Sequence, residues 1–269
     1  MKLLQELSSK LNHLFLLELC DGNRIEAVFY RGDTLCISTQ VGCAIGCAFC
    51  ISGKEGFLRN LTEVEIIAQY ELVRSKLPVK RIAMAGIGEP LMNWKNVEKA
   101  FWYFKNRGIG VSFYTSGHPT VRLRELLRLP HGGVTISLHS VFEKKRKALM
   151  PHGGALEEVI RTLKEELVEL PVRKRRRISL AYMLLKGLND SEEELIELAG
   201  MAKDLGICVT LLRYNKTVDE YEDVEENDYE RAFLLLRSYG IRVTLSTRFR
   251  RDRIGGCGTL AVNRSLTEC

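Results

Sequence analysis

The feature that most constrains the fold is a regular alternation of short apolar runs and longer amphipathic runs over most of this 269-residue chain. The short runs are rich in β-branched and aromatic residues and predict strands, whereas the longer runs carry apolar residues at helical spacing. Repeated strand–helix units of this length produce parallel strands covered by helices. The predicted strands are 34–39, 81–86, 110–116, 133–139, 177–185, 208–214 and 242–248, and the predicted helices are 61–77, 96–106, 121–129, 155–168, 191–205 and 226–239.

About six strand–helix units are fewer than the eight that close a full barrel. We therefore predict an α/β fold built as a partial (β/α)6 barrel, with a doubly wound open sheet as the second choice. In either architecture the loops at the C-terminal ends of the strands carry the chemistry.

The N-terminal residues are predicted to form a small extension of this core. Apolar residues at helical spacing predict a helix near the start, and two β-rich runs, 14–19 and 24–30, flank the turn sequence Asp21-Gly22-Asn23. We therefore divide the chain into an N-terminal helix and β-hairpin extension, residues 1–32, and a barrel core with a C-terminal extension, residues 33–269.

Composition predicts a cytoplasmic protein with no membrane partner. No apolar run approaches the roughly 18 residues of a membrane span, and the N-terminus has no small-residue cleavage site. In a reducing compartment the eight cysteines are expected to bind metal or do chemistry rather than form a disulfide framework. The net charge of +6 gives a mild preference for anionic partners.

Three of the cysteines lie in one short loop after the first predicted core strand. The segment 41–50 reads VGCAIGCAFC and spaces Cys43, Cys47 and Cys50 as C-x3-C-x2-C. Three thiolates can hold three irons of a cubane cluster, and the fourth iron then keeps an open position, as catalytic metal sites do. The alternatives are a zinc site completed by a distant cysteine or histidine, and buried structural cysteines.

Polar and glycine-rich residues follow the other predicted strands at the same edge of the sheet. A single strand-end glycine is usually only a turn, but a cluster at the same end of several strands predicts a site. The segments are Gly86–Pro90, Tyr114–Gly117, Ser137–His139, Asn189 and Tyr214–Asn215.

The cysteine loop, at this place in the series, is the signature of the radical S-adenosylmethionine (SAM) enzymes. The whole stretch 34–66 resembles the signature region of radical SAM methyltransferases that modify an adenine in 23S ribosomal RNA, the RlmN and Cfr type. The further matching pieces follow the family's order from about Leu17 to Leu260: AGIGEPLMN (85–93), TSG (115–117), SLH (137–139), LMP (149–151), YMLLKGLND (182–190), LLRYN (211–215) and GGCGTL (255–260).

This resemblance implies two cofactors, a [4Fe-4S] cluster and SAM. Cys43, Cys47 and Cys50 correspond to the cluster ligands, and the amino and carboxylate groups of SAM chelate the fourth iron. The residues that correspond to the SAM pocket are Gly88 and Glu89, which bind the amino group, and Ser137, Leu138, His139 and Asn215.

The resemblance also implies a catalytic route to a methylated adenine carbon, position 2 or 8, in 23S ribosomal RNA or transfer RNA. One SAM methylates Cys257, a radical derived from a second SAM activates that methyl group, and the resulting carbon adds to the base. Cys36 then releases the crosslink through disulfide formation, and Glu26 takes up a proton. Adenine amidine carbons are not nucleophilic, so a radical is needed, and an electron donor such as flavodoxin or ferredoxin is implied.

Three features depart from the family pattern. Few residues precede the hairpin, so we expect a short member that lacks most of the N-terminal accessory domain. Tyr114 stands where the family usually has a small hydroxyl residue, and no SAM contact is transferred to it. The sequence CGTL (257–260) replaces the more common CGQL.

Two groups of basic residues are candidates for phosphate contacts, with a solvated surface as the alternative. One group is the run 173–177. The other lies close to Cys257 in the sequence and consists of Arg248, Arg250, Arg251 and Arg253.

Two other functions stay open from the sequence. A different radical SAM enzyme, such as a glycyl-radical activase, needs the cluster loop but neither Cys36 nor Cys257. A zinc-bearing RNA-binding protein would hold zinc in place of iron. No chemical role is assigned to Cys20, Cys208 and Cys269.

Overall fold

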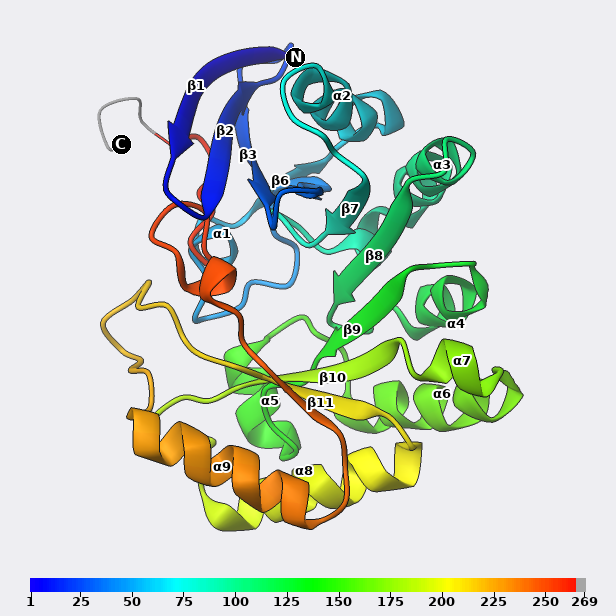
Figure 1. The fold of residues 1–269 in the computed structure, drawn as a ribbon, viewed down its shortest axis with the longest axis vertical. Helices are drawn as coiled ribbons and strands as arrows, with labels where there is room; N and C mark the ends of the chain where they lie inside the picture. Colours follow the sequence, from blue (N-terminus) through cyan, green and yellow to red (C-terminus); the bar gives the residue numbers. More distant parts are fainter. Residues whose placement is uncertain (265–269) are drawn as a thin grey trace.

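The computed structural model describes residues 1–264, which form a ten-stranded sheet with helices packed on its outer side (Figure 1). Along the sheet the strand order is β1-β2-β3-β4-β7-β8-β9-β10-β11-β12, and every pair from β4 to β12 is parallel. The strands are β1 (Lys2–Ser8), β2 (Asn12–Glu18), β3 (Arg24–Tyr30), β4 (Thr34–Ile37), β7 (Arg81–Met84), β8 (Gly110–Thr115), β9 (Gly133–Ser137), β10 (Ile178–Met183), β11 (Cys208–Leu212) and β12 (Val243–Leu245).

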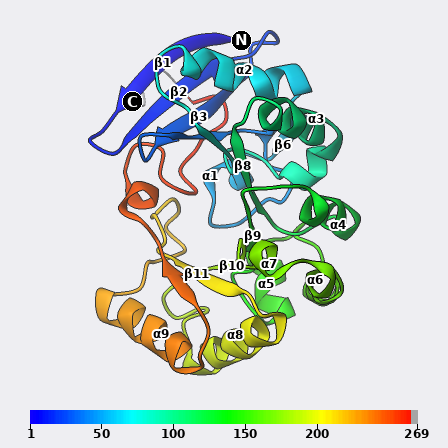
Figure 2. The same ribbon diagram turned by 45° about the vertical axis from the view of Figure 1, so that its right-hand side comes forward.

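Six long helices connect successive parallel strands, as the sequence pattern predicts. Figure 2 shows them along the outer side of the curved sheet. The shorter α5 (Glu143–Leu149) and α7 (Val172–Arg175) were not expected from the pattern. The long helices are α2 (Glu63–Arg74), α3 (Trp94–Lys105), α4 (Thr120–Arg128), α6 (Leu156–Glu169), α8 (Glu192–Leu205) and α9 (Glu226–Ser238).

The ends of these elements follow from local chemistry. Helix α2 begins with a capping box: the Thr62 hydroxyl accepts a hydrogen bond from the Glu65 amide, and the Glu65 carboxylate accepts one from the Thr62 amide. Helix α8 begins at Ser191, whose side chain accepts from Glu194 N, and it ends at Gly206 in the left-handed conformation.

The middle of the parallel sheet is buried, whereas the edge strand β12 is largely exposed. Strand β10 has no exposed residue along its whole length. Within the described residues β4 pairs with β3 and β7, and β12 pairs with β11 alone. The α/β prediction is therefore confirmed as an open, incomplete barrel of parallel strands with an antiparallel extension.

The helix predicted near the N-terminus is wrong, because Lys2–Ser8 forms strand β1. This strand pairs antiparallel with β2, and its side chains Leu3 and Leu7 pack against the core. A short isolated helix is marginal in water, whereas an edge strand gains a ladder of hydrogen bonds from its neighbour. The predicted hairpin is confirmed: β2 and β3 pair across Asp21-Gly22-Asn23, with Gly22 at a φ of 83°.

The C-terminal segment crosses the open side of the sheet, from β12 back to β2 and β3 (Figure 1, orange to red). The Asn12 side-chain amide on β2 donates to the carbonyls of Phe249 and Ile254, at 2.8 and 2.9 Å. Further along, Asn263 N donates to Arg24 O on β3 at 3.2 Å. The segment that carries Cys257 is therefore held against β2 and β3 of the antiparallel extension.

Among the helices of residues 1–264, none has the length and apolar character needed to cross a membrane.

Candidate functional site

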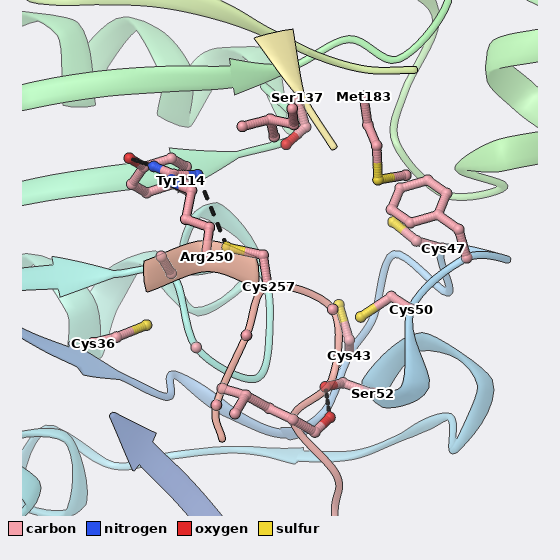
Figure 3. A pocket seen from close by; sticks show the side chains of 18 of the residues that line it. Cys36, Cys43, Cys47, Cys50, Ser52, Tyr114, Ser137, Met183, Arg250 and Cys257 are labelled. Carbon is pink, nitrogen blue, oxygen red and sulfur yellow. Dashed lines mark hydrogen bonds between the residues drawn. The ribbon is translucent and has the colours of Figure 1, made fainter. Parts of the chain in front are cut away.

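A cavity of about 230 Å³ lies at the C-terminal ends of the parallel strands, where the sequence places the chemistry (Figure 3). The cluster loop, strands β4, β8 and β9, and the segment around Cys257 contribute to its lining. The predicted site residues that line it are Cys36, Cys43, Cys47, Cys50, Gly88, Glu89, Ser137, His139 and Cys257.

The loop with the three cysteines is closed by a two-stranded ribbon, β5 (Gln40–Gly42) and β6 (Phe57–Asn60), with α1 (Ile51–Lys54) between them. Cys43 N donates to Gly56 O at 3.0 Å. Gly42 has a φ of 76°, and a Cβ there would lie 1.8 Å from Gly56 O. A Cβ on Gly53 would lie 2.5 Å from Cys47 O. Both glycines are therefore needed for this tight loop.

Burial controls the three thiols of this loop. It raises the pKa of Cys43 to about 12, raises that of Cys47 well above its usual range, and raises that of Cys50. Thiols in such surroundings are neutral unless a cation takes the place of the proton. The loop thus provides three buried sulfurs that become thiolates when they bind iron.

A buried cation lies beside the cysteine loop. Arg146 on α5 is 1 % exposed, and its guanidinium donates to the carbonyls of Ser116 and Gly153 at 3.0 Å and of Gly154 at 2.5 Å. Within residues 1–264 its Nε has no hydrogen-bond partner; burial lowers the pKa of Arg146, and the charges of Glu143 and Cys47 oppose that fall. A buried charge is costly unless negative charge lies near it. Thiolates that bind a cluster would add negative charge beside this cation, so the residues present fit the predicted [4Fe-4S] group.

The three thiols lie on one loop and line the same cavity. Each thiolate of a cubane cluster binds a separate iron. The donor set of three sulfurs on one loop therefore fits the cluster.

Glu89 provides a buried carboxylate across the cavity from the cysteine loop. It accepts hydrogen bonds from Leu91 N, Thr115 Oγ1 and Ser116 N, at 3.0, 2.5 and 2.7 Å. Burial raises its pKa to about 6, so the group is an anion at neutral pH. Gly88 precedes it at a φ of 107°. A fixed carboxylate facing the cavity fits the ammonium group of SAM, as predicted.

Gln40 joins the cysteine loop to the Glu89 turn, and the sequence reading missed it. Its side-chain oxygen accepts from Ala44 N at 3.1 Å and from Glu89 N at 2.9 Å, and its nitrogen donates to Asn60 at 2.8 Å. In the sequence it is only a glutamine three positions before the first cluster cysteine, and its full burial is visible only in the structure.

His139 forms hydrogen bonds with the end of β10 and with Asn189 in the loop that follows it. Its Nδ1 accepts from Met183 N at 3.1 Å, and its carbonyl accepts from the Asn189 side chain at 2.6 Å. Burial, together with the charge of Arg146, lowers its pKa to about 3. The ring is therefore neutral, and it anchors the end of β9 while it lines the cavity.

Two residues predicted for the SAM pocket do not line the cavity with their side chains. Leu138 is fully buried in the main core. Asn215 follows β11, and its amide donates to Arg250 O at 2.7 Å and to Cys257 O at 2.9 Å. Asn215 therefore fixes the loop that carries Cys257.

Glu26 also lies outside the cavity. Its buried carboxylate accepts from Ala261 N at 2.9 Å and pairs with Arg264 Nε at 2.5 Å. Burial raises its pKa, and Arg264 opposes that rise. The observed role of Glu26 is to hold the chain just after Cys257, and its part in proton uptake stays a prediction.

Cys36 and Cys257 face the same cavity from distant parts of the sequence. Cys36 lies on β4, and burial, with a smaller effect of Cys257, raises its pKa to about 12. Cys257 is exposed, at the tip of a loop with glycine on both sides. The disulfide predicted between them is not formed, because all seven cysteines of residues 1–264 are free thiols. Cys269 lies outside the described residues.

The two basic groups do not form one surface. The run 173–177 precedes β10 and lies at the N-terminal end of that strand, whereas Arg248–Arg251 lies by the cavity at the opposite ends. Figure 1 shows α7 and the orange-red segment far apart. The two groups therefore cannot act together on one surface, because a run that enters a strand cannot reach the end where that strand stops. Whether either group contacts phosphates stays a prediction.

An incomplete parallel barrel with three loop cysteines at the C-terminal ends of its strands defines the class of radical SAM enzymes. Residues 37–199 match the family described as the Radical SAM superfamily. The crystal structure of a radical SAM methyltransferase from Sphaerobacter thermophilus is similar, with a TM-score of 0.86 and 28% identity over 96% of this chain and 80% of that chain.

Curated relatives show which family within this superfamily the chain resembles. The chain is 36% identical over 255 residues to a "Probable RNA methyltransferase" of Stutzerimonas stutzeri, across 91% of this chain and 72% of the relative. It is 33% identical over 267 residues to a "Probable dual-specificity RNA methyltransferase RlmN" of Pseudothermotoga lettingae, across 94% and 77%. The chain belongs to the RlmN-type family of radical SAM RNA methyltransferases, whose cofactors are a [4Fe-4S] cluster and SAM.

Proposed function

We propose that the protein methylates carbon 2 or carbon 8 of an adenine in RNA, with Cys257 as the carrier of the methyl group. The observation that supports this most is the position of Cys36 and Cys257. These two cysteines lie outside the cluster loop and face the cavity that the cluster loop also lines. A carrier and a resolving thiol are the two groups that this route needs beyond the cofactors.

The chain's residues have separate tasks in binding the cofactors. Cys43, Cys47 and Cys50 would hold the cluster, and Glu89 would accept hydrogen bonds from the ammonium group of SAM. When bound, the cluster and SAM supply a methyl group and a radical that removes a hydrogen atom. The buried thiols and the Arg146 cation suit the charge of this centre.

Cys257 accepts the methyl group on its sulfur and later holds the activated carbon against the base. Asn12 and Asn215 fix the loop on either side, so the sulfur faces the cavity. Release follows when Cys36 gives up its thiol proton and its sulfur forms a bond with the Cys257 sulfur, while the bond from the Cys257 sulfur to the methylene carbon breaks. The electron pair goes to carbon, which takes a proton, and the disulfide exists only in this step.

The substrate and partners follow from the relatives' names and from the chemistry. We propose 23S ribosomal RNA or a transfer RNA as substrate, since curated relatives are named dual-specificity RNA methyltransferases. The route consumes an electron, for which flavodoxin or ferredoxin is the proposed donor. We place the reaction in the cytoplasm, where thiols stay reduced.

The test is direct analysis of RNA after reaction. The reconstituted protein is incubated anaerobically with SAM, dithionite and unmodified ribosomal or transfer RNA, and the digested nucleosides are separated by mass. We expect methyladenosine with the wild type and none with Cys36→Ala or Cys257→Ala. Cys20→Ala, an exposed cysteine outside the cavity, is the matched control. SAM cleavage that continues in both variants with no methylated RNA in any sample would favour a different radical SAM reaction, such as glycyl-radical activation.

A further inference from the structure

Arg250 places a positive charge between Tyr114 and Cys257 in the cavity (Figure 3). Its guanidinium carbon lies 4.6 Å from the centre of the Tyr114 ring, and its Nη2 donates to the Tyr114 hydroxyl. Its Nη1 donates to Cys257 Sγ at 3.9 Å. A single side chain therefore connects the end of β8 to the proposed methyl carrier.

Backbone hydrogen bonds also hold Arg250 close to Cys257. The Arg250 carbonyl accepts from Cys257 N at 3.0 Å and from the Asn215 side chain at 2.7 Å. Because the backbone bond fixes the distance between the two residues, the guanidinium can reach the sulfur of its own loop. The Tyr114 ring then limits where the guanidinium can go, as cation–π contacts do.

The charge of Arg250 is not neutralised by a carboxylate. In residues 1–264, Arg251 contacts Asp223, whereas Arg250 forms no ion pair with Asp or Glu. The titratable groups whose charges act on Arg250 or Cys257 are Tyr30 on β3, Cys36 on β4, Cys50 in the cluster loop and Tyr114 on β8. Further titratable or charged groups that line the same cavity are Cys43, Cys47, Glu89, His139, Arg213 and Tyr214.

The surroundings leave one thiol as the natural partner of the cation. Burial raises the pKa of Tyr30 and that of Cys36, so both stay protonated at neutral pH. Cys257 is the more exposed of the two cysteines that line the cavity from outside the cluster loop, and it is the one that Arg250 contacts. A thiolate there gains a charge-assisted hydrogen bond.

We propose that Arg250, held by Tyr114, is a positioning residue that keeps the Cys257 sulfur as an ion-paired thiolate ready to accept a methyl group. The inference rests on the proposed carrier role of Cys257. The thiol first loses its proton to solvent. Its sulfur lone pair then forms the bond to the methyl carbon of SAM, while the bond from that carbon to the sulfonium breaks and its electron pair stays on the departing S-adenosylhomocysteine.

This inference also accounts for a departure from the family pattern. Tyr114 replaces a small hydroxyl residue, which could offer Arg250 a hydrogen bond but no ring. The chain thus carries a tyrosine and an arginine that contact each other and the carrier. Once Cys257 is methylated its sulfur has no charge, so the contact weakens and the methylated side chain is free to turn.

The first test uses cluster-free protein without SAM or RNA. The rate at which iodoacetamide modifies Cys257 is measured against pH, from the mass of the tryptic peptide 254–264. An opposite charge within reach shifts a thiol pKa by about 1–3 units. We therefore expect Arg250→Met to move the midpoint up by at least about one unit and to slow alkylation at pH 7 about tenfold. Arg250→Lys should restore most of the rate.

Two further variants separate this effect from a loss of structure. Tyr114→Phe keeps the ring and removes the hydroxyl, and we expect a smaller shift in the same direction. Arg248→Met is the matched control, because Arg248 lies on the same turn and contacts the Phe249 ring; its profile should equal that of the wild type. An unshifted profile for Arg250→Met, with circular dichroism like that of the wild type, overturns the inference.

A second measurement distinguishes this inference from the proposed function. Reconstituted wild type and Arg250→Met are incubated with SAM alone, and methylation of Cys257 is followed with time. Methylation of both proteins at the same rate overturns the role of Arg250 while the carrier role stands. A wild type that never becomes methylated overturns the proposed function itself. The expected result is methylation of both, with Arg250→Met about tenfold slower.

Discussion

Gln40→Met tests whether one buried amide holds the cluster loop and the Glu89 turn together. Methionine has a similar size and flexibility, but its thioether sulfur is only a weak hydrogen-bond acceptor. The substitution would leave Ala44 N and Glu89 N without their acceptor in a position where Gln40 is fully buried. The expected damage lies in the two segments that bind the cluster and SAM.

The size of the effect follows from the two orphaned donors. Each buried amide without an acceptor costs about 1–3 kcal/mol, which gives about 2–6 kcal/mol before any relaxation. Burying a thioether in place of an amide offsets about 1 kcal/mol. We therefore expect the free energy of unfolding to fall by about 3 kcal/mol, which raises the unfolding equilibrium constant more than about a hundredfold.

Urea unfolding of the cluster-free protein, followed by circular dichroism, measures this change. Iron content and absorbance near roughly 400 nm after reconstitution show whether the loop still binds the cluster. Asn60→Ala is the control, because it removes only the exposed partner of the Gln40 nitrogen and should cost less than about 1 kcal/mol. A Gln40→Met protein as stable as the control, with full iron, would refute the reasoning.

Two further predictions follow from buried charges. Arg146→Met leaves three carbonyls without a donor and is expected to destabilise the protein by about 3 kcal/mol and to lower iron per chain; urea unfolding with unchanged midpoint and iron content would contradict this. Burial, with Lys174 and Arg177, lowers the pKa of His131 to about 4. The neutral His131 ring therefore contributes to the free energy of unfolding above pH 6.5, and this contribution is lost as the pH falls from 6.5 toward 4. We expect the free energy of unfolding to fall by about 2 kcal/mol between pH 6.5 and 5. In His131→Leu, urea unfolding should show a smaller dependence on pH over this range. Equal slopes for the two proteins would rule that assignment out.

The parts of the fold that could be predicted are those with a local pattern. Each parallel strand shows as a short β-branched run, and each covering helix shows as an apolar stripe, so the order of elements was right. Thr62 followed by Glu65 three residues later is also a local pattern, and the two form the capping box at the start of α2. The first strand was not, because seven residues with a weak pattern form a strand only when β2 lies beside them.

The site likewise has parts that a short sequence signature predicts and parts that depend on contacts between distant residues. The cysteine loop and the Gly88-Glu89 turn have short sequence signatures, and the structure places them at one cavity. The contacts that hold Cys257 join residues far apart in the chain, such as Asn12 with Ile254 and Asn215 with Cys257. Such pairs leave no spacing that a single sequence can show.

Glu26 illustrates the limit of transferring a role by position. The resemblance matched its place on β3, but the role of a carboxylate depends on what surrounds it. Here Arg264 and Ala261 N occupy both of its oxygens. Tyr114 is the opposite case, since a residue set aside as a departure from the family contacts the arginine beside the carrier.

The central claim is that Cys257 carries the methyl group, and the most direct test is the mass of the tryptic peptide Ile254–Arg264. Protein reconstituted with iron and sulfide under anaerobic conditions is incubated with SAM that carries a deuterated methyl group, and the peptide is then sequenced by fragmentation. The account predicts one deuterated methyl group on the Cys257 sulfur. A peptide that stays unmodified in cluster-loaded protein that binds SAM would contradict it.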